Sequence, residues 1–176
     1  MIKRGKIINN TKGQEFMGMS FSIMFSIFLI IVFIVIAFIA IKAFLSTQQC
    51  AQVGIFKKDF QADVDKAWNS ASLSLEFKRS LPSTIEYVCF ANFSEILSSN
   101  GIEGKIGNDI KVYDETESNM FFYPLENACE MPGNQINHLN IAEITKTKNP
   151  YCIKTSKGQI ILKIEKPLRE VLVRVS

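Results

Sequence analysis

The chain has 176 residues, with 20 basic and 17 acidic side chains and a formal net charge of +3. This length allows one globular domain with a core of its own beside any membrane segment, but not two. The excess of positive charge lies in a short N-terminal segment and the remaining residues are neutral overall, so no basic binding face is indicated and we expect no nucleic acid among its partners.

A long uncharged run follows the N-terminus. No charged residue lies between Glu15 and Lys42, and residues 27–41 are all apolar. As a helix rising about 1.5 Å per residue, this run spans roughly 39 Å, more than the ~30 Å hydrocarbon core of a bilayer. The alternative is a buried core helix, but so small a domain could not surround it on every side. The run predicts a single-pass transmembrane helix, which we place at residues 14–46.

The charges before this run indicate its orientation. The basic side chains there belong to Lys3, Arg4, Lys6 and Lys12, with Glu15 as the only acid. Positive charge beside a membrane span stays cytoplasmic. We therefore expect a basic leader at residues 1–13 on the cytoplasmic side and an extracytoplasmic α+β domain at residues 47–176.

All cysteines follow the predicted span: Cys50, Cys89, Cys129 and Cys152. An even number in a small exported domain predicts two disulfides, with three pairings open. Shorter loops close more readily, which favours Cys50 with Cys89 and Cys129 with Cys152. A metal site is disfavoured, because no two cysteines have the spacing of zinc ligands and the chain has one histidine.

Beyond the membrane, an apolar stripe predicts that the helix continues over residues 55–68. Apolar residues recur there at steps of three and four: Ile55, Phe56, Phe60, Val64, Ala67 and Trp68. Such a stripe is typical of an amphipathic helix, and we expect it to pack on the sheet of the extracytoplasmic domain.

The rest of the domain is predicted to be an antiparallel, β-rich head. Alternating and turn-bounded apolar residues predict strands at 73–78, 85–89, 109–113, 120–123, 151–155, 159–165 and 168–175. A short helix is expected at 93–97, and loops at 101–108 and 127–137. Lys157 and Gly158 predict the turn of a hairpin between the strands at 151–155 and 159–165.

No pattern indicates catalysis, a cofactor or a bound metal. Gly101 and Gly104 lack the lysine and following helix of a phosphate-binding loop. His138 stands alone in a polar segment, where a histidine more often meets solvent than acts as a base. We therefore expect no enzymatic activity. Asn92 opens the tripeptide Asn-Phe-Ser, a glycosylation sequon that is also common by chance, and is our candidate for modification.

A short motif precedes the apolar run. Lys12-Gly13-Gln14, placed after a basic leader and directly before the helix, resembles the class III signal of type IV prepilins, the archaeal version in particular. The resemblance implies that prepilin peptidase cuts between Gly13 and Gln14 and that the helix stays on the mature protein below a β-rich head. Bacterial pilins usually place a glutamate fifth after the cut, where this chain has Gly18. Charge pairing of the bacterial kind between subunits is therefore not implied.

Two functions are consistent with these features. The first is a structural subunit of a type IV pilus-like filament or secretion assembly, whose partners are membrane lipid, copies of itself or other pilin-like subunits. The second is a single-pass membrane-anchored binding domain that never polymerises. Small residues in the first turns of the helix suit helix–helix packing and favour the first function: Gly18, Ser20, Ser22 and Ser26.

Overall fold

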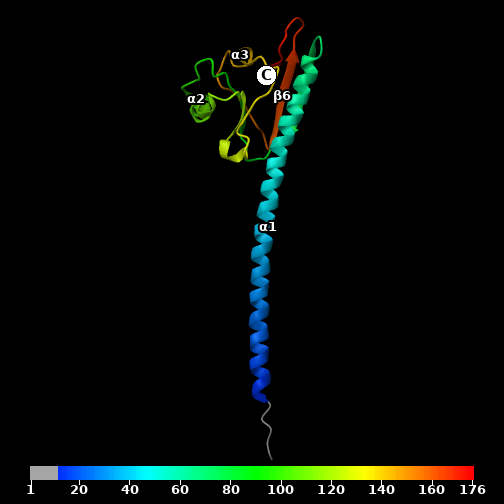
Figure 1. Cartoon of the computed structure of the whole chain (residues 1–176), viewed down its shortest axis with the longest axis vertical. Coiled ribbons are helices and arrows are strands. Elements are labelled where there is room, and N and C mark those ends of the chain that lie inside the picture. The colour runs from blue at the N-terminus through cyan, green and yellow to red at the C-terminus, as the bar shows by residue number, and fades with distance from the viewer. Residues whose placement is uncertain (1–11) are drawn as a thin grey trace, which may run out of the picture. The chain divides into compact units, whose positions relative to one another are not determined.

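The computed structural model describes the backbone of residues 12–176 and the side chains of residues 21–176. The chain divides into two compact units, Met1–Ser46 and Thr47–Ser176, and we call the second unit the head. The elements follow in this order (Figure 1): α1 Lys12–Trp68, β1 Leu73–Ser80, β2 Tyr87–Phe90, α2 Gly101–Ile110, η1 Lys111–Tyr113, β3 Met120–Tyr123, η2 Leu125–Asn127, β4 Gly133–Asn134, α3 Ile141–Ile144, β5 Tyr151–Lys154, β6 Gln159–Lys166 and β7 Arg174–Val175.

The part of α1 in the first unit is a helix of apolar side chains. An 18-residue window within Phe21–Trp68 has a mean hydropathy of 3.3, and none of its residues is buried. By length and composition this helix could cross a membrane, and it is the one candidate span in the described residues. A surface of this kind is unfavourable in water.

The part of α1 in the head has the predicted amphipathic register. Its buried residues are Val53, Phe56, Phe60, Val64 and Ala67. Ile55 and Trp68 were expected in the same stripe, but their exposed fractions are 57% and 37%. Ile55 directly precedes the buried Phe56, and Trp68 directly follows the buried Ala67. Successive side chains on a helix point about 100° apart, so both residues lie at the edge of the buried face.

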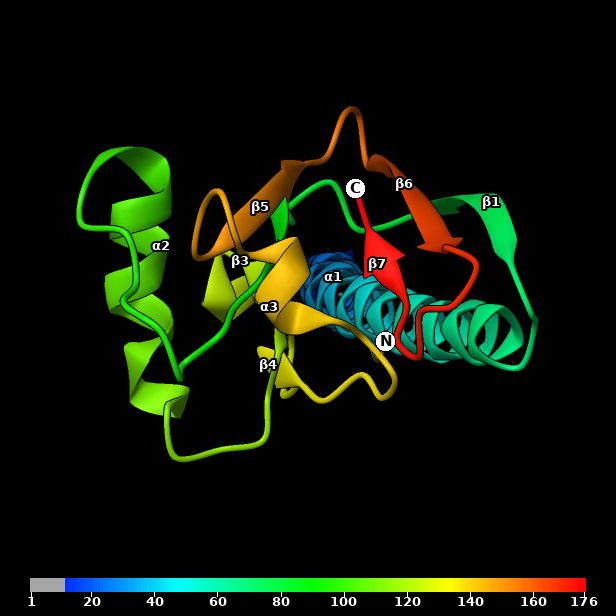
Figure 2. The same cartoon turned by 90° about the horizontal axis from the view of Figure 1, so that it is seen from above.

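Two antiparallel sheets share a core with this part of α1. The strand orders are β1-β6-β7 and β4-β3-β2-β5 (Figure 2). Phe77 of β1, Val88 of β2 and Leu162 of β6 belong to the same buried cluster as the α1 residues. The head is therefore mixed α+β. One buried cluster lies between α1 and both sheets, and a second includes Ile106 and Ile110 of α2 with Phe121 of β3.

The predicted hairpin around Lys157 and Gly158 is wrong in its pairing but right in its turn. Both residues have positive φ angles, 50° and 70°, as a tight reversal requires. Ser156 and Gln159 bridge the turn, with N···O distances of 2.7 and 2.9 Å. Past this bridge the strands separate, because β5 pairs with β2 whereas β6 pairs with β1 along its whole length.

The segment after β2 also differs from the prediction. Residues 93–97 form no helix, whereas the expected loop at 101–108 is helix α2, and the expected strand at 109–113 is the end of α2 and η1. Ile106 and Ile110 lie four residues apart and are both fully buried, which anchors one face of α2. The last expected strand, 168–175, is reduced to β7.

Candidate functional site: the exposed helix and its attachment to the head

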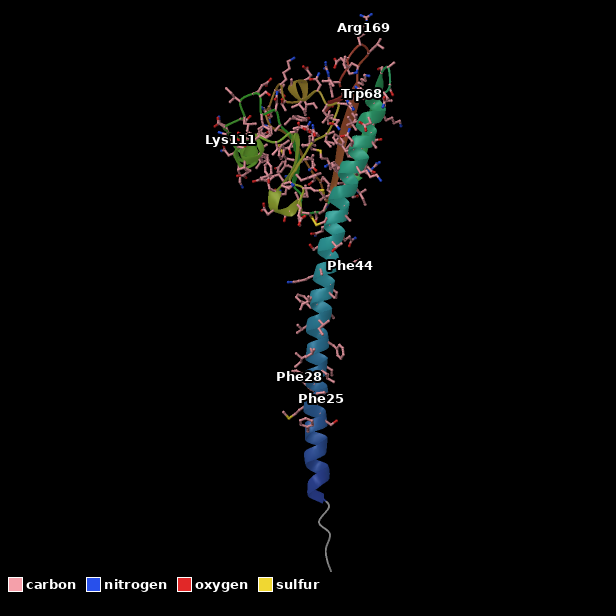
Figure 3. The ribbon with its side chains drawn as sticks, viewed as in Figure 1. Phe25, Phe28, Phe44, Trp68, Lys111 and Arg169 are labelled. Atoms are coloured by element: carbon pink, nitrogen blue, oxygen red, sulfur yellow. A yellow bond between two sulfur atoms is a disulfide. The ribbon has the colours of Figure 1, made fainter. Side chains whose placement is uncertain are left out.

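The apolar surface of α1 is formed by large side chains that are exposed in the described structure. Phe25, Phe28 and Phe44 project from the helix (Figure 3), with exposed fractions of 52%, 60% and 70%. The Nζ of Lys42 lies 4.7 Å from the ring centroid of Phe38, so the first charge after the run also covers apolar surface. The chemistry of such a surface suits lipid tails or other apolar helices.

The small polar residues predicted to favour packing lie near the start of this surface. The Oγ of Ser26 donates a hydrogen bond to the carbonyl oxygen of Ser22 at 2.9 Å. Ser26 therefore satisfies its hydroxyl within its own helix, and the two residues, four apart, lie on one face. Gly18 and Ser20 precede residue 21, the first residue whose side-chain environment is described.

A disulfide joins α1 to the rest of the head, close to the point where the helix enters this unit at Thr47. Cys50 of α1 is bonded to Cys129, with an S–S distance of 2.02 Å and a Cα–Cα distance of 5.6 Å. The pairing that loop length favours, Cys50 with Cys89, is therefore wrong. Doubling a loop costs only about 0.6 kcal/mol in closure entropy, which is too little to outweigh the positions that the fold imposes.

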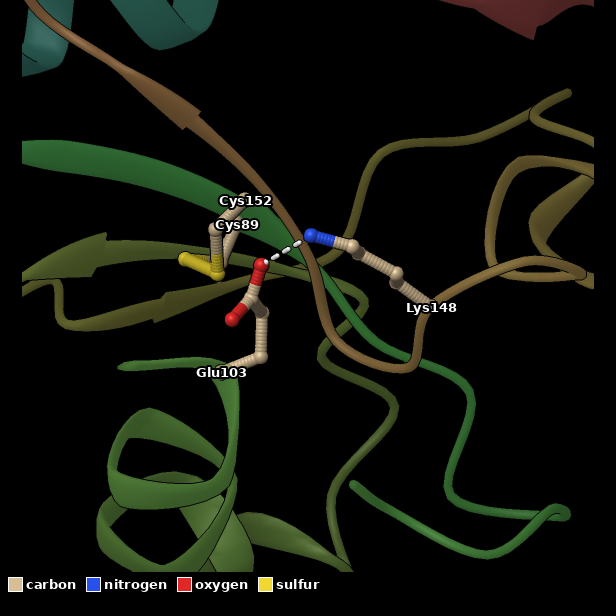
Figure 4. The surroundings of a disulfide bond; sticks show 4 residues. All are labelled: Cys89, Glu103, Lys148 and Cys152. Atoms are coloured by element: carbon tan, nitrogen blue, oxygen red, sulfur yellow. Dashed lines mark hydrogen bonds and ion pairs between the residues drawn. A yellow bond between two sulfur atoms is a disulfide. The ribbon is translucent and has the colours of Figure 1, made fainter. Parts of the chain in front are cut away.

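The second disulfide lies between two strands. Cys89 of β2 and Cys152 of β5 are directly opposite each other in the antiparallel ladder, with a Cα–Cα distance of 4.0 Å. Beside them, the Nζ of Lys148 donates to a carboxylate oxygen of Glu103 at 2.7 Å (Figure 4). This hydrogen bond lowers the pKa of Glu103 and raises that of Lys148. The ion pair links α2 to the segment that precedes β5.

Aromatic contacts hold α1 against both sheets. The ring of Phe56 meets Phe77 of β1 edge to face at 5.2 Å and Phe122 of β3 at 5.5 Å. Phe60 meets Phe77 at 5.2 Å and Phe90 of β2 at 5.9 Å. The Phe56–Phe77, Phe56–Phe122 and Phe60–Phe77 pairs are edge to face, and such pairs add about 0.5–1.5 kcal/mol each to the burial itself. The helix is therefore anchored to each sheet by fully buried rings.

Further contacts fix the C-terminal end of α1 at Trp68. The ring of His138 stacks on Trp68, with 3.8 Å between centroids and 8° between planes, and its Nε2 lies 3.8 Å from Oδ1 of Asp65. The Nζ of Lys166 donates to the carbonyl oxygen of Trp68 at 2.6 Å. His138 was expected to meet solvent or a hydrogen-bonding partner, and no local pattern indicates its stack on Trp68, because the two residues are far apart in the chain.

The other predicted site residues are placed as follows. Gly13 and Gln14 lie in the first turn of α1, and the leader before Lys12 lies outside the described residues. The Oδ1 of Asn92 accepts a hydrogen bond from the backbone N–H of Ser94 at 3.1 Å, and the Asn149 amide binds the backbone of Asn92. The described residues contain no group of three or more potential metal ligands.

The chain was compared with families, sequences and structures of known proteins. It matches no protein-family model, no curated protein and no solved structure. Its function is therefore inferred from the residues and geometry above.

Proposed function

We propose that the protein is a structural subunit of a type IV pilus-like filament or secretion assembly. The observation that carries this proposal is the division of α1. From Phe21 to Ile41, where its side chains are described, α1 carries only apolar and small polar residues, whereas its C-terminal part is fixed to the head by Phe56, Phe60 and Cys50. No linker residues separate the two parts, since α1 is one helix from Lys12 to Trp68.

In this proposal α1 anchors the subunit in the cell membrane before assembly. The basic leader stays cytoplasmic and the head faces the outside, where an oxidising environment suits the two disulfides. Prepilin peptidase cuts between Gly13 and Gln14, as the resemblance to archaeal type IV prepilins implies. Assembly then transfers the apolar helix from lipid into a bundle of equivalent helices, from copies of this chain or from other pilin-like subunits.

The protein is proposed to work by assembly, without a catalytic step. The polar clusters of the head support this, because their partners are structural. Glu103 pairs with Lys148, and Asp59 pairs with Arg79 at 2.9 Å. Each of these ion pairs joins two elements of the fold.

The mature N-terminus is the decisive measurement. The protein is expressed in a cell that supplies the peptidase, isolated from the membrane and analysed by mass spectrometry, with electron microscopy of the surface material. We expect an N-terminus at Gln14 and filaments that contain the chain. Gly13→Val should block cleavage, whereas Gly5→Val, a matched change inside the leader, should not.

The second candidate is a membrane-anchored binding domain that never polymerises. A free strand edge of the head, described below, is the observation that favours it. An intact Met1, together with a protein that stays monomeric in the membrane while the assembly ATPase is present, would replace the filament proposal with this one.

A further inference from the structure

The separation of β5 from β6 leaves one side of β5 without a neighbouring strand. β5 is the outermost strand of its sheet, in the order β4-β3-β2-β5. β6 belongs to the other sheet and meets the β5 side only at the bridge between Ser156 and Gln159. Figure 2 shows β5 and β6 leaving this turn toward different parts of the head. An open strand edge of this kind is a template for another strand.

The hydrogen-bond register identifies which backbone groups are free. The N–H of Thr155 donates to the carbonyl oxygen of Glu86 at 2.8 Å, which continues the β2–β5 ladder. In an antiparallel pair, alternate residues point their N–H and C=O groups toward the partner strand. Tyr151 and Ile153 therefore face β2, whereas the backbone groups of Cys152 and Lys154 point the other way. No backbone hydrogen bond from the described residues reaches them.

The position of the disulfide agrees with this register. Opposed residues without mutual hydrogen bonds have the shorter Cα–Cα distance in an antiparallel ladder, about 4.5 Å compared with about 5.5 Å. Cys89 and Cys152 are 4.0 Å apart, so they form a pair of the first kind. The covalent bond also holds β5 on the sheet, which keeps its outer edge in place for a partner.

The side chains at this edge give it a basic character. A hollow of about 480 Å³ is lined by Lys154, Ser156, Lys157, Gln159 and Ile161. The two lysines are exposed, and neither has an ion-pair partner within the described residues. The side chain of Ile161 is 53% exposed and supplies one apolar contact. A segment that fills this hollow would meet two uncompensated positive charges beside the strand edge.

We propose that the outer edge of β5 binds an extended, acidic segment of a partner polypeptide by strand addition. The segment pairs its backbone with the free groups of Cys152 and Lys154. Its carboxylates face Lys154 and Lys157, and an apolar residue packs on Ile161. Main-chain pairing supplies the affinity, and the alternating side chains supply the selectivity. This binding requires neither leader cleavage nor filament assembly, so it stands or falls independently of the proposed function.

The test uses the full chain in detergent micelles and a defined probe. The probe is a blocked octapeptide that alternates valine and aspartate. It has three controls. Two are versions of the same peptide with N-methyl groups on alternate residues, one for each edge of the strand, so that each lacks the donors of one edge. The third is a valine–lysine version. Binding is measured by titration, and amide hydrogen exchange is followed at single residues.

We expect the acidic probe to bind and to slow exchange at the amides of Cys152 and Lys154. N-methylation on the pairing edge should abolish binding, as should replacement of aspartate by lysine. The double variant Lys154→Glu/Lys157→Glu should weaken binding by about tenfold or more, because two favourable charge pairs become repulsive. Lys58→Glu/Lys111→Glu, which makes the same charge change at exposed lysines of α1 and η1, should bind as the wild type does.

Several outcomes would overturn the inference. They are the absence of binding by the acidic probe, unchanged exchange at Cys152 and Lys154, and affinity that survives both N-methylated peptides. Equal affinity for the acidic and basic probes would exclude the acidic partner. Protection that appears only along β1 would place the strand on the other sheet and reject the β5 site.

Discussion

Cys50 and Cys129 form a covalent bridge between α1 and the long loop after β3, across a sequence separation of 79 residues. The bridge lies at the start of the helix segment that packs on the head, before Phe56 and Phe60. The bridge and the aromatic contacts therefore fix the same segment of α1 to the rest of the head. The bond is therefore expected to stabilise the packing of this segment on the head.

The double variant Cys50→Ser/Cys129→Ser tests this role. Loss of a bridge that closes so long a loop should reduce the free energy of unfolding of the head by about 2–4 kcal/mol. Urea unfolding in micelles, followed by tryptophan fluorescence of Trp68, measures the change. In this variant dithiothreitol can reduce only the Cys89–Cys152 bond, so any further loss of stability on reduction belongs to that second disulfide. An unchanged midpoint would show that the bridge does not stabilise the head.

Phe60→Ala tests the contact between helix and sheets. Phe60 is fully buried and meets the rings of Phe77 and Phe90, so its removal should cost about 3–5 kcal/mol of unfolding free energy. Lys57→Ala is the control on the same helix and should stay within ~0.5 kcal/mol. Equal effects of the two substitutions in chemical denaturation would contradict the observed register.

Two glycines of the head provide a matched pair. A Cβ at Gly104 of α2 would lie 2.4 Å from the carbonyl carbon of Ser99, whereas a Cβ at Gly54 of α1 would meet only the Cε of Met131 at 3.8 Å. Gly104→Ala should therefore destabilise the head by about 1–3 kcal/mol through overpacking. Gly54→Ala should be neutral or stabilising by up to about 1 kcal/mol, since alanine favours helix. Thermal unfolding of both variants measures this contrast.

The ion pair between Glu103 and Lys148 predicts a pH dependence. Its hydrogen bond lowers the pKa of Glu103, so the stabilisation is complete above the carboxyl's ordinary pKa and is lost as pH falls through the folded-state value. The raised pKa of Lys148 keeps the pair charged until strongly alkaline pH. Wild type and Glu103→Gln should therefore differ in stability at neutral pH and converge below about pH 4. A difference independent of pH would exclude the ion pair as its cause.

Two substitutions in the apolar helix separate membrane insertion from assembly. Val32→Lys places a charge in the middle of the run, where lysine costs about 2.5–3.5 kcal/mol on insertion scales, so both the membrane fraction and filaments should be lost. Ser22→Leu should leave insertion intact and reduce filaments alone, because a larger side chain would stand on the proposed packing face. Val32→Leu is the control. Membrane fractionation and electron microscopy distinguish these results, and wild-type filament numbers in Ser22→Leu would reject that face.

The sequence by itself determined the features that depend on local periodicity. The uncharged run between Glu15 and Lys42 required an apolar helix, and the spacing of Phe56, Phe60 and Val64 determined which face of α1 is buried. A helical stripe is specified by residues three and four apart, so one segment contains all the information that it needs. The strands β1, β3 and β6 were predictable for the same reason, from alternation and flanking turns.

Only the tertiary structure decided which distant segments meet. The turn at Lys157 and Gly158 predicted a hairpin, but the β1–β6 and β2–β5 ladders draw its two strands into different sheets. Those ladders also set the disulfide pairing, because Cys89 faces Cys152 across the β2–β5 register whatever the loop lengths favour. Strand partners are chosen by the burial and backbone pairing of the whole head, and these long-range terms exceed the small differences in local propensity and loop entropy that a linear sequence displays.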